Sequence, residues 1–279
     1  MTLKDKILKP FEGNQIYHKI RNLYWDIRQY PVYKKTQSEI KKRQSGIFDN
    51  KYNEFLKLKN KYKGERCFIV ATGPSLTIED LEKLNGEYTF AMNSIKKLYA
   101  KTDWRPTFFG IQDRFVYKAM EDVILITNKE EQIAFISDDL TKLYDVPENF
   151  VVFPYDGCYH SFVGEKGKPN AKFTDNAQVI VYDGYSITYS LIQIAVYMGF
   201  EEIYLLGCDC SWGNGKDHII ESGHIDKFAN LNPIKQRTAY KCALDYSKEH
   251  NFKIYNATRG GELETFERVN LDDVLKGKK

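Results

Sequence analysis

Short apolar runs alternate with amphipathic stretches from residue 66 to the end of the chain. Short apolar runs bounded by polar or glycine positions are typical of strands, and apolar residues at three- and four-residue spacing are typical of helices. The predicted strands are 66–71, 88–91, 107–111, 122–127, 133–137, 150–154, 202–206 and 252–256. The predicted helices are 77–84, 94–100, 114–120, 186–199 and 233–250. Because strands such as 203–206 are apolar throughout, the pattern predicts a doubly wound, mainly parallel α/β fold of a modified Rossmann type.

Residues 1–64 follow a different pattern and are expected to form a basic helical extension ahead of an α/β catalytic domain at 65–279. Apolar residues recur at helical spacing along 16–27, Pro31 is expected to break this helix, and a further helical piece is predicted at about 50–63. The segment has 16 lysines and arginines against 6 acidic residues, which leaves 25 against 32 in the remainder. Two interpretations stay open, namely an anionic membrane surface as partner, or a solvated extension that can serve as an oligomer contact. Because the rest of the chain is acidic and has no recognition module, nucleic acid is not an expected partner.

Composition limits the class of protein. At 279 residues and 42% hydrophobic content, the chain is long enough to bury a sizeable core. Apolar runs of the length that spans a membrane, about 18 residues, do not occur, and the first ten residues lack the apolar centre of a signal peptide. The five cysteines are unevenly placed, as expected for reduced thiols in the cytoplasm. Cys208 and Cys210 lack a second Cys or His pair at ligand spacing, so no metal site is predicted.

The stretch from Cys67 to Leu76 reads as a buried strand, a sharp turn at residues 72–75 and the start of a helix. Thr77 and Asp80 have the spacing of a capping box at that helix. A strand that enters a glycine turn and a helix N-terminus is suited to bind an anion such as phosphate. The turn has neither the Walker nor the dinucleotide-binding spacing, so a nucleotide or nucleotide sugar remains open as ligand. The alternative is a tight connection without a ligand.

Several stretches in a fixed order resemble a known family. They are 69–76 (IVATGPSL), 90–93 (FAMN), 186–200 (SITYSLIQIAVYMGF), 202–209 (EIYLLGCD) and 252–261 (FKIYNATRGG). Together they resemble the bacterial sialyltransferases of the Campylobacter lipooligosaccharide type, within the superfamily that includes motility accessory factors and 6-hydroxymethylpterin diphosphokinase-like proteins. The resemblance covers about residues 66–270 and implies a nucleotide-binding α/β fold with a cytidine-monophosphate sugar as donor.

The resemblance also implies donor-binding residues. By position these are Thr72, Gly73, Pro74, Ser75, Asn93, Gln112, Ser186 and Thr188. Arg259 is a further candidate on its charge alone, which suits a phosphate. Gln112 stands where the family has a second Asn, so base and sugar remain open. Asn93 and Ser186 have an alternative role as helix caps, and Arg259 as an exposed turn residue. Asp209 follows a strand at its carboxyl end, where it either contacts the ligand or bonds its own loop.

Glycosyl transfer needs a base for the acceptor hydroxyl, and histidine suits that role. His218 and His224 are the candidates, because both lie in the region where the related enzymes carry their base. Of the two, His224 is favoured slightly. In the family, tyrosine hydroxyls stabilise the leaving phosphate; Tyr155, Tyr159 and Tyr185 are available, and Trp212 stands where an aromatic partner is expected. Asp138 and Asp139 are adjacent, which is not the metal-binding Asp-x-Asp spacing, and are expected to cap a helix.

These observations predict a cytoplasmic, membrane-peripheral glycosyltransferase with catalytic residues among His224, His218 and Asp209. It is expected to transfer sialic acid or another nonulosonic acid, with inversion, from a nucleotide sugar to a surface glycan such as capsule or lipooligosaccharide. No cofactor is expected. Two alternatives stay open: an ATP-dependent diphosphokinase of the 6-hydroxymethylpterin type, in which Asp209 holds Mg²⁺, and a scaffold without catalysis.

Overall fold

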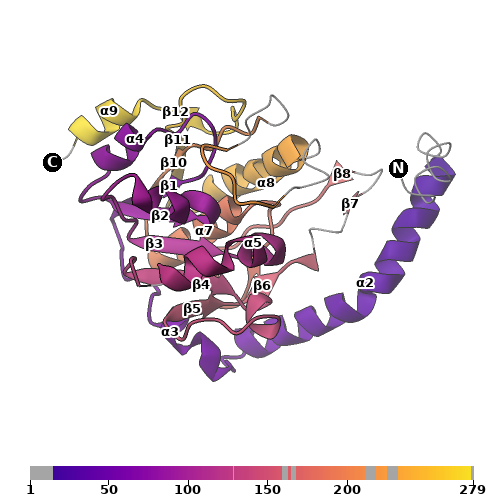
Figure 1. The fold of residues 1–279 in the computed structure, drawn as a ribbon. Coiled ribbons are helices and arrows are strands. Elements are labelled where there is room, and N and C mark those ends of the chain that lie inside the picture. Colours follow the sequence, from indigo (N-terminus) through magenta and orange to yellow (C-terminus); the bar gives the residue numbers. More distant parts are fainter. Residues whose placement is uncertain are drawn as a thin grey trace.

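The computed structural model describes residues 15–127, 129–158, 163–164, 168–211, 218–224 and 232–277. Its centre is a parallel sheet of eight strands in the order β12-β11-β10-β1-β2-β3-β4-β5, with helices on both faces (Figure 1). The strands are β1 (Arg66–Val70), β2 (Tyr88–Met92), β3 (Phe108–Ile111), β4 (Ile133–Ser137), β5 (Phe150–Phe153), β10 (Glu202–Leu206), β11 (Lys253–Asn256) and β12 (Glu267–Arg268). The predicted α/β fold is confirmed.

Alternate residues of each strand face opposite layers, because side chains in a strand point alternately to its two faces. On one face Ile69, Phe90 and Phe108 pack with α7 (Ile187–Met198), α8 (Asn232–Ser247) and α3 (Asn53–Leu56). On the other face Phe68 and Phe109 pack against the layer of α4 (Ile78–Lys83), η3 (Asn93–Ala100), α5 (Arg114–Ile126) and α9 (Leu271–Lys276). Burial on both faces explains why these strands read as continuous apolar runs.

One predicted strand, 122–127, is wrong. These residues complete α5, which begins after the cap residue Asp113. Short apolar runs are ambiguous between strand and helix. Here only the residues on one helical face are buried: Ile124 is 0% exposed, whereas Ile126 is 81% exposed.

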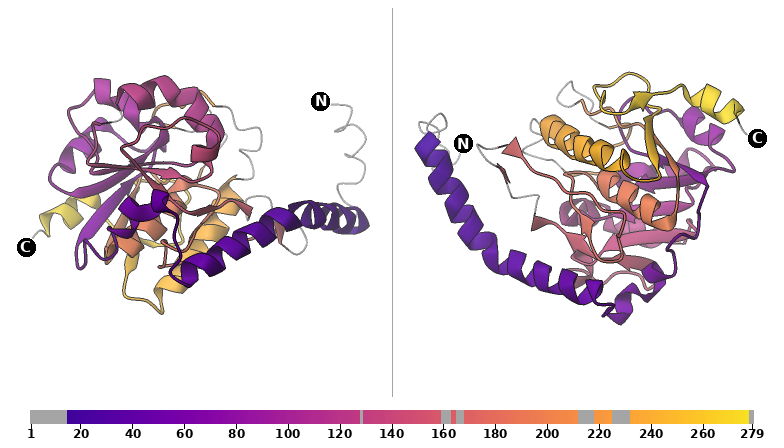
Figure 2. Two further views of the ribbon diagram at one scale, coloured as in Figure 1. Left: turned by 90° about the horizontal axis from the view of Figure 1, so that it is seen from below. Right: turned by 180° about the vertical axis from the view of Figure 1, so that it is seen from behind.

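The N-terminal segment also differs from its prediction. Pro31 does not end the first helix, because α2 runs without interruption over Gln15–Gln44. A proline inside a long helix can be accommodated as a bend, and α2 is curved rather than straight in Figure 2.

The helical piece predicted at 50–63 is shorter than expected. It consists of the 3₁₀ helix η2 (Asn50–Tyr52) and α3, followed by turns. The backbone N–H groups of Asn60 and Tyr62 donate to the last carbonyls of α7, at Tyr197 and Met198. Those carbonyls lack partners within their own helix, so the segment at 57–64 serves as the C-terminal cap of α7. The boundary predicted at residue 64 stays a prediction.

Four short strands and one short 3₁₀ helix complete the described fold. β6 (Tyr155–Asp156) pairs with β9 (Val181–Tyr182), and β7 (Val163–Gly164) pairs with β8 (Lys168–Pro169). The 3₁₀ helix η4 (Leu140–Lys142) follows Asp138 and Asp139, but neither carboxylate caps it, contrary to prediction. Asp138 instead accepts hydrogen bonds from the Tyr52 hydroxyl at 2.9 Å and the Tyr155 N–H at 3.1 Å. None of the described helices is both long enough and apolar enough to cross a bilayer.

Candidate functional site

The carboxyl ends of all the strands of the main sheet lie at one edge, because the strands are parallel. Strands β1 to β5 extend the sheet in one direction and β10 to β12 extend it in the other, so the chain order reverses between β1 and β10. In open α/β sheets, ligands bind at this reversal. The turn after β1 and the loop after β10 meet here, where the Gly73 N–H donates to the Gly207 carbonyl at 2.9 Å.

Asp209 occupies the bend after β1. Its side chain is 6% exposed, and its Oδ2 accepts from the Ser75 hydroxyl at 2.8 Å and the Ser75 N–H at 3.4 Å. A Cβ at Gly73 would lie 2.0 Å from this oxygen and 2.4 Å from the Gly207 carbonyl, so the bend tolerates no side chain at that position. Asp209 therefore bonds the β1 bend rather than its own loop. The Ser75 N–H, which the sequence suggested for a phosphate, points at the carboxylate of the protein itself.

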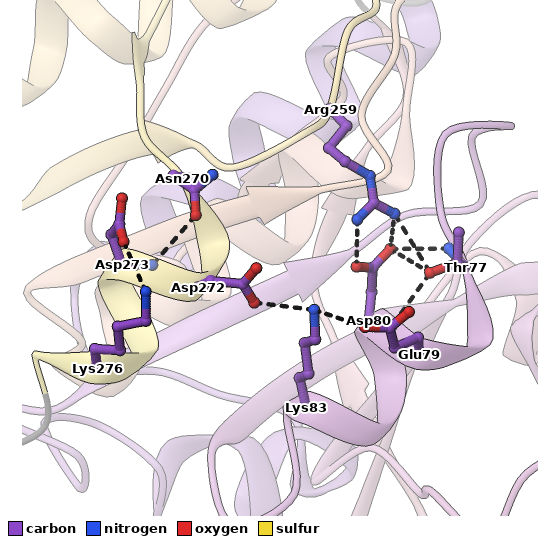
Figure 3. A network of polar contacts seen from close by, with 9 residues as sticks. All are labelled: Thr77, Glu79, Asp80, Lys83, Arg259, Asn270, Asp272, Asp273 and Lys276. Atoms are coloured by element: carbon purple, nitrogen blue, oxygen red, sulfur yellow. Dashed lines mark hydrogen bonds and ion pairs between the residues drawn. The ribbon is translucent and has the colours of Figure 1, made fainter.

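The N-terminus of α4 is also occupied. The predicted capping box is confirmed, with the Thr77 side chain accepting from the Asp80 N–H and the Asp80 carboxylate accepting from the Thr77 N–H. Arg259 reaches across from the loop after β11 and donates to both carboxylate oxygens of Asp80 (Figure 3). It also donates to the Ser75 carbonyl at 3.3 Å. The charge of Arg259 is thus matched by Asp80; its assignment to a donor phosphate stays a prediction.

Two amide side chains at the ends of β2 and β3 have oxygens that accept no hydrogen bond from a described residue. Asn93 Oδ1 and Gln112 Oε1 are buried oxygens without a hydrogen-bond partner among the described residues. Asn93 does not cap the helix that follows, because Met92 is the cap residue and makes no side-chain bond. Gln112 Nε2 donates to the Tyr155 hydroxyl at 3.5 Å. Since buried polar atoms nearly always have partners, these two oxygens require an explanation.

The start of α7 is explained by structure. Ser186 caps the helix, accepting from the Thr188 N–H at 3.2 Å, which confirms the capping alternative for this residue. The Thr188 side chain is buried, and its hydroxyl donates to Met92 Sδ at 3.2 Å. That Ser186 and Thr188 contact a ligand stays a prediction.

Tyr155, Asp183 and Tyr185 form a further group at this edge. Removal from water and the Asp183 carboxylate raise the pKa of Tyr155, so this hydroxyl stays protonated at neutral pH and donates its hydrogen bond to Asp183. Asp183 accepts from the Tyr185 N–H at 3.0 Å. Burial raises the pKa of Tyr185 to about 12. The role of Asp183 was missed from the sequence; the run Asp-Gly-Tyr-Ser before a helix was the available signal.

Of the four described non-glycine residues with positive φ, three lie at this same edge, and the fourth, Asn60, lies at the C-terminal end of α7. Asn93, Tyr185 and Cys210 have positive φ values of 49°, 65° and 51°. For a bulky residue such as tyrosine, this conformation is a genuine outlier. Strained residues cluster at ligand and active sites, where the surrounding structure holds them in place.

Residues 218–224, here called the strap, run across the carboxyl ends of β1 and β2. The Ile219 N–H donates to the Thr72 carbonyl at 2.8 Å, and the Ser94 hydroxyl donates to the Ile220 carbonyl at 2.6 Å. His218 Nδ1 lies 3.1 Å from the Thr72 hydroxyl, beside the bend. His224 lies at the first turn of α5, stacked on Phe115 with ring centroids 5.3 Å apart. The two histidines therefore lie at different ends of the strap, and the choice between them stays a prediction.

The cysteines after β10 are buried. Burial raises the pKa of Cys208, and Cys210 Sγ lies 3.5 Å from Gln236 Oε1. Within the described ranges, no three His, Cys, Asp or Glu residues are grouped so as to hold a metal ion. Tyr159 and Trp212, which were considered from the sequence, lie outside the described residues.

A hollow of about 390 Å³ lies away from this edge, at the amino-terminal ends of β2 and β3. Its lining includes Arg105 and Glu130, which pair with each other at 3.0 Å. The strained residues and the two unpartnered amide oxygens lie at the opposite edge, which is therefore the candidate site.

Three comparisons with known proteins bear on the site. The comparison with curated proteins finds no match. Among solved structures, it is similar to the MAf glycosyltransferase from Magnetospirillum magneticum AMB-1, with 16% identity, a TM-score of 0.45, and coverage of 78% of this chain and 37% of that one. The chain thus spans little more than a third of the Magnetospirillum protein. It is also similar to the sialyltransferase CstII from Campylobacter jejuni, again with 16% identity. The complex with cytidine-5′-monophosphate gives a TM-score of 0.47 and coverage of 74% and 85%, and the complex with CMP-3FNeuAc gives 0.42 with coverage of 74% and 86%.

The family model described as "6-hydroxymethylpterin diphosphokinase MptE-like" matches residues 45–215. The match covers more than half of the chain, from the turn after α2 to the loop after β10. The chain therefore belongs to the 6-hydroxymethylpterin diphosphokinase MptE-like family.

Proposed function

We propose that this protein is a glycosyltransferase that binds a nucleotide sugar, linked through a cytidine monophosphate, along the edge from β10 to β3. The observation that carries the proposal is the pair of buried amide oxygens, on Asn93 and Gln112, that have no hydrogen-bond partner within the described protein. An oxygen acceptor is satisfied by a hydroxyl or amino group and not by a phosphate oxygen. A nucleotide sugar supplies such donors on its base, its ribose and its sugar.

The dimensions of the edge support an extended ligand. Neighbouring strands lie about 4.8 Å apart, so the three intervals from β10 to β3 span roughly 15 Å. The Asp209 carboxylate at one end suits a ribose or acceptor hydroxyl, because an anionic acceptor binds a hydroxyl donor strongly and repels phosphate. At the other end, the unpartnered Oε1 of Gln112 suits a hydroxyl group of the sugar.

The proposed reaction is a single displacement. The acceptor hydroxyl attacks the anomeric carbon, the bond from this carbon to the phosphate oxygen breaks with its electron pair going to the phosphate, and a histidine takes the hydroxyl proton. His218 and His224 are the candidate bases. Thr72 holds Nδ1 of His218 at 3.1 Å, which orients that ring beside the bend.

Calorimetric titration with CMP-linked sugars tests the proposal. Asn93→Gly removes one amide and keeps the positive φ, which glycine adopts readily, and Gln112→Met removes the other while keeping the side-chain length. Each lost hydrogen bond is worth about 1 kcal/mol, so each variant is expected to bind about fivefold more weakly.

Asn85→Gly is the matched control, because Asn85 is exposed at the opposite edge of the sheet and is expected to leave binding unchanged. The unliganded Gln112→Met variant should lose at most about 1 kcal/mol of unfolding free energy, because Oε1 has no partner among the described residues and the bond from Nε2 to the Tyr155 hydroxyl is long, at 3.5 Å. Unchanged affinity in both edge variants, or the absence of binding by the parent chain, would refute the proposal.

A diphosphokinase is the second candidate, and the family match favours it. In that case Asp209 would hold Mg²⁺, and ATP would give a diphosphate to a pterin alcohol with release of AMP. Against it, the donors of the bend at Ser75 are engaged by Asp209, which leaves no free backbone cradle there for a triphosphate. Formation of AMP from ATP with a pterin alcohol, without binding of cytidine nucleotides, would establish this activity instead.

A further inference from the structure

The N-terminal half of α2 carries an apolar stripe. Ile20, Leu23, Ile27 and Tyr30 are 63%, 58%, 67% and 53% exposed. At 100° per residue these four positions fall within an arc of roughly 80°. Large hydrophobic side chains that gather on one exposed helical face mark an interaction surface.

The two halves of α2 differ in their attachment. Near the C-terminal end of the helix, Ile40 is 6% exposed and packs with Val179 and Ile180. Arg43 is 7% exposed and donates to the Val179 carbonyl. Ahead of this anchor the helix extends beyond the α/β body, as the left view of Figure 2 shows, and the striped half lies on this extension (Figures 1 and 2).

The charge beside the stripe decides whether a second copy of the chain or an anionic lipid surface binds it. Lys19 and Arg28 are exposed along this half of the helix. Lys34 and Lys35 are exposed just beyond it, and Lys34 continues the line of the stripe itself. Two copies packed through the stripe would bring these cations together. An anionic bilayer neutralises them, while basic side chains reach the headgroups and apolar ones enter the boundary beneath.

We propose that the stripe of α2 (Ile20, Leu23, Ile27 and Tyr30) docks on an anionic lipid surface, with the neighbouring lysines and Arg28 contacting the headgroups. This inference does not depend on the reaction at the sheet edge. It assigns the projecting half of α2 the function of holding the α/β body beside a membrane, without crossing it.

Sedimentation of the full chain with vesicles tests the proposal. We expect binding to vesicles of phosphatidylcholine and phosphatidylglycerol, much weaker binding to phosphatidylcholine alone, and release by salt. Ile27→Glu places a charge on the stripe. Val32→Glu is the matched control, because Val32 is also exposed, at 52%, yet lies about 140° around the helix from Ile27.

The two variants carry the same change in charge, so their difference isolates the apolar face. Ile27→Glu should bind about tenfold more weakly than Val32→Glu, the effect of removing one buried isoleucine from the lipid boundary. Equal binding by the two variants, or no preference of the parent for anionic vesicles, would overturn the proposal. If the parent chain forms a dimer that Ile27→Glu dissociates, while vesicle binding is unchanged, the stripe packs against a second copy of the chain and not against lipid. That result would also overturn the proposal.

Discussion

Replacing Gly73 with alanine tests the packing of the β1 bend in one step. The new Cβ would stand 2.0 Å from Asp209 Oδ2 and 2.4 Å from the Gly207 carbonyl oxygen, both far inside van der Waals contact. Asp209 can rotate away, but Ser75 then loses its charged acceptor. The Gly207 carbonyl belongs to the backbone and is itself held by the Gly73 N–H at 2.9 Å, so relief on that side requires the two loops to separate.

The expected cost follows from these two contacts. Overpacking in a close-packed region costs about 1–3 kcal/mol, and loss of a hydrogen bond to a charged acceptor costs about 1.5–3 kcal/mol. Gly73→Ala is therefore expected to lower the free energy of unfolding by roughly 3–5 kcal/mol. In urea titrations this appears as a lower midpoint with an unchanged slope.

A control and a double variant make this measurement decisive. Gly277→Ala meets only atoms at 3.6 Å and beyond, with an ordinary φ of −74°, and is expected to change stability by less than about 0.5 kcal/mol. Asp209→Ala in the Gly73→Ala background removes the nearer clash. The double variant should therefore lose less unfolding free energy than the sum of the losses in the two single variants. A Gly73→Ala protein within about 1 kcal/mol of the parent would refute the described packing of the bend.

Three further predictions concern charges. Lys96→Met should lower the free energy of unfolding in urea by about 3–5 kcal/mol, because it leaves a buried charge unpaired. The side chains of Lys96 and Glu131 are both 0% exposed and pair at 2.6 Å. Adding Glu131→Leu should therefore recover most of the loss. Burial raises the pKa of Asp156 in the native protein above its unfolded value near 3.8, so the native protein keeps this proton to a higher pH than the unfolded chain does. The native protein therefore loses stability as the pH rises above about 3.8 and through the raised pKa. Asp156→Asn does not titrate, and its stability relative to the parent should therefore increase between pH 4 and 7. Arg259→Gln should lower stability by about 1 kcal/mol by removing a partner of Asp80, and a variant as stable as the parent would show that the exposed half of that pair contributes nothing.

Most of the sheet was predictable because each of its central strands is a buried apolar run between polar turns. The failures have a common cause in tertiary packing. The run at 122–127 is apolar enough for a strand, but it continues a helix whose first turn is fixed by Asp113. Strands β6 to β9 and β12 are two residues long, too short to carry a period. Pro31 lies inside α2, where a long helix accommodates a proline as a bend.

The candidate site was predictable in position but not in contacts. Parallel topology alone brings Gly73, Asn93, Gln112 and Asp209 to one edge, so their neighbourhood follows from the strand assignments. The bond of Ser75 to Asp209, however, joins residues 134 apart in sequence. It depends on β10 lying beside β1, an adjacency that hydrophobic periodicity does not contain.

The occupied bend changes what kind of ligand the edge can bind. A phosphate that took the Ser75 N–H would have to displace Asp209, exchanging one charged hydrogen bond for another and leaving a nearly buried carboxylate without its partner. That exchange gives no net gain, so anion binding is disfavoured at β1 although the turn resembles a phosphate loop. Acceptor oxygens without a described partner lie further along, on Asn93 and Gln112. Like Asp209, they bind hydroxyl or amino groups and not phosphate oxygens. The hydroxyl and amino groups of a bound nucleotide sugar are therefore expected at these oxygens and at Asp209.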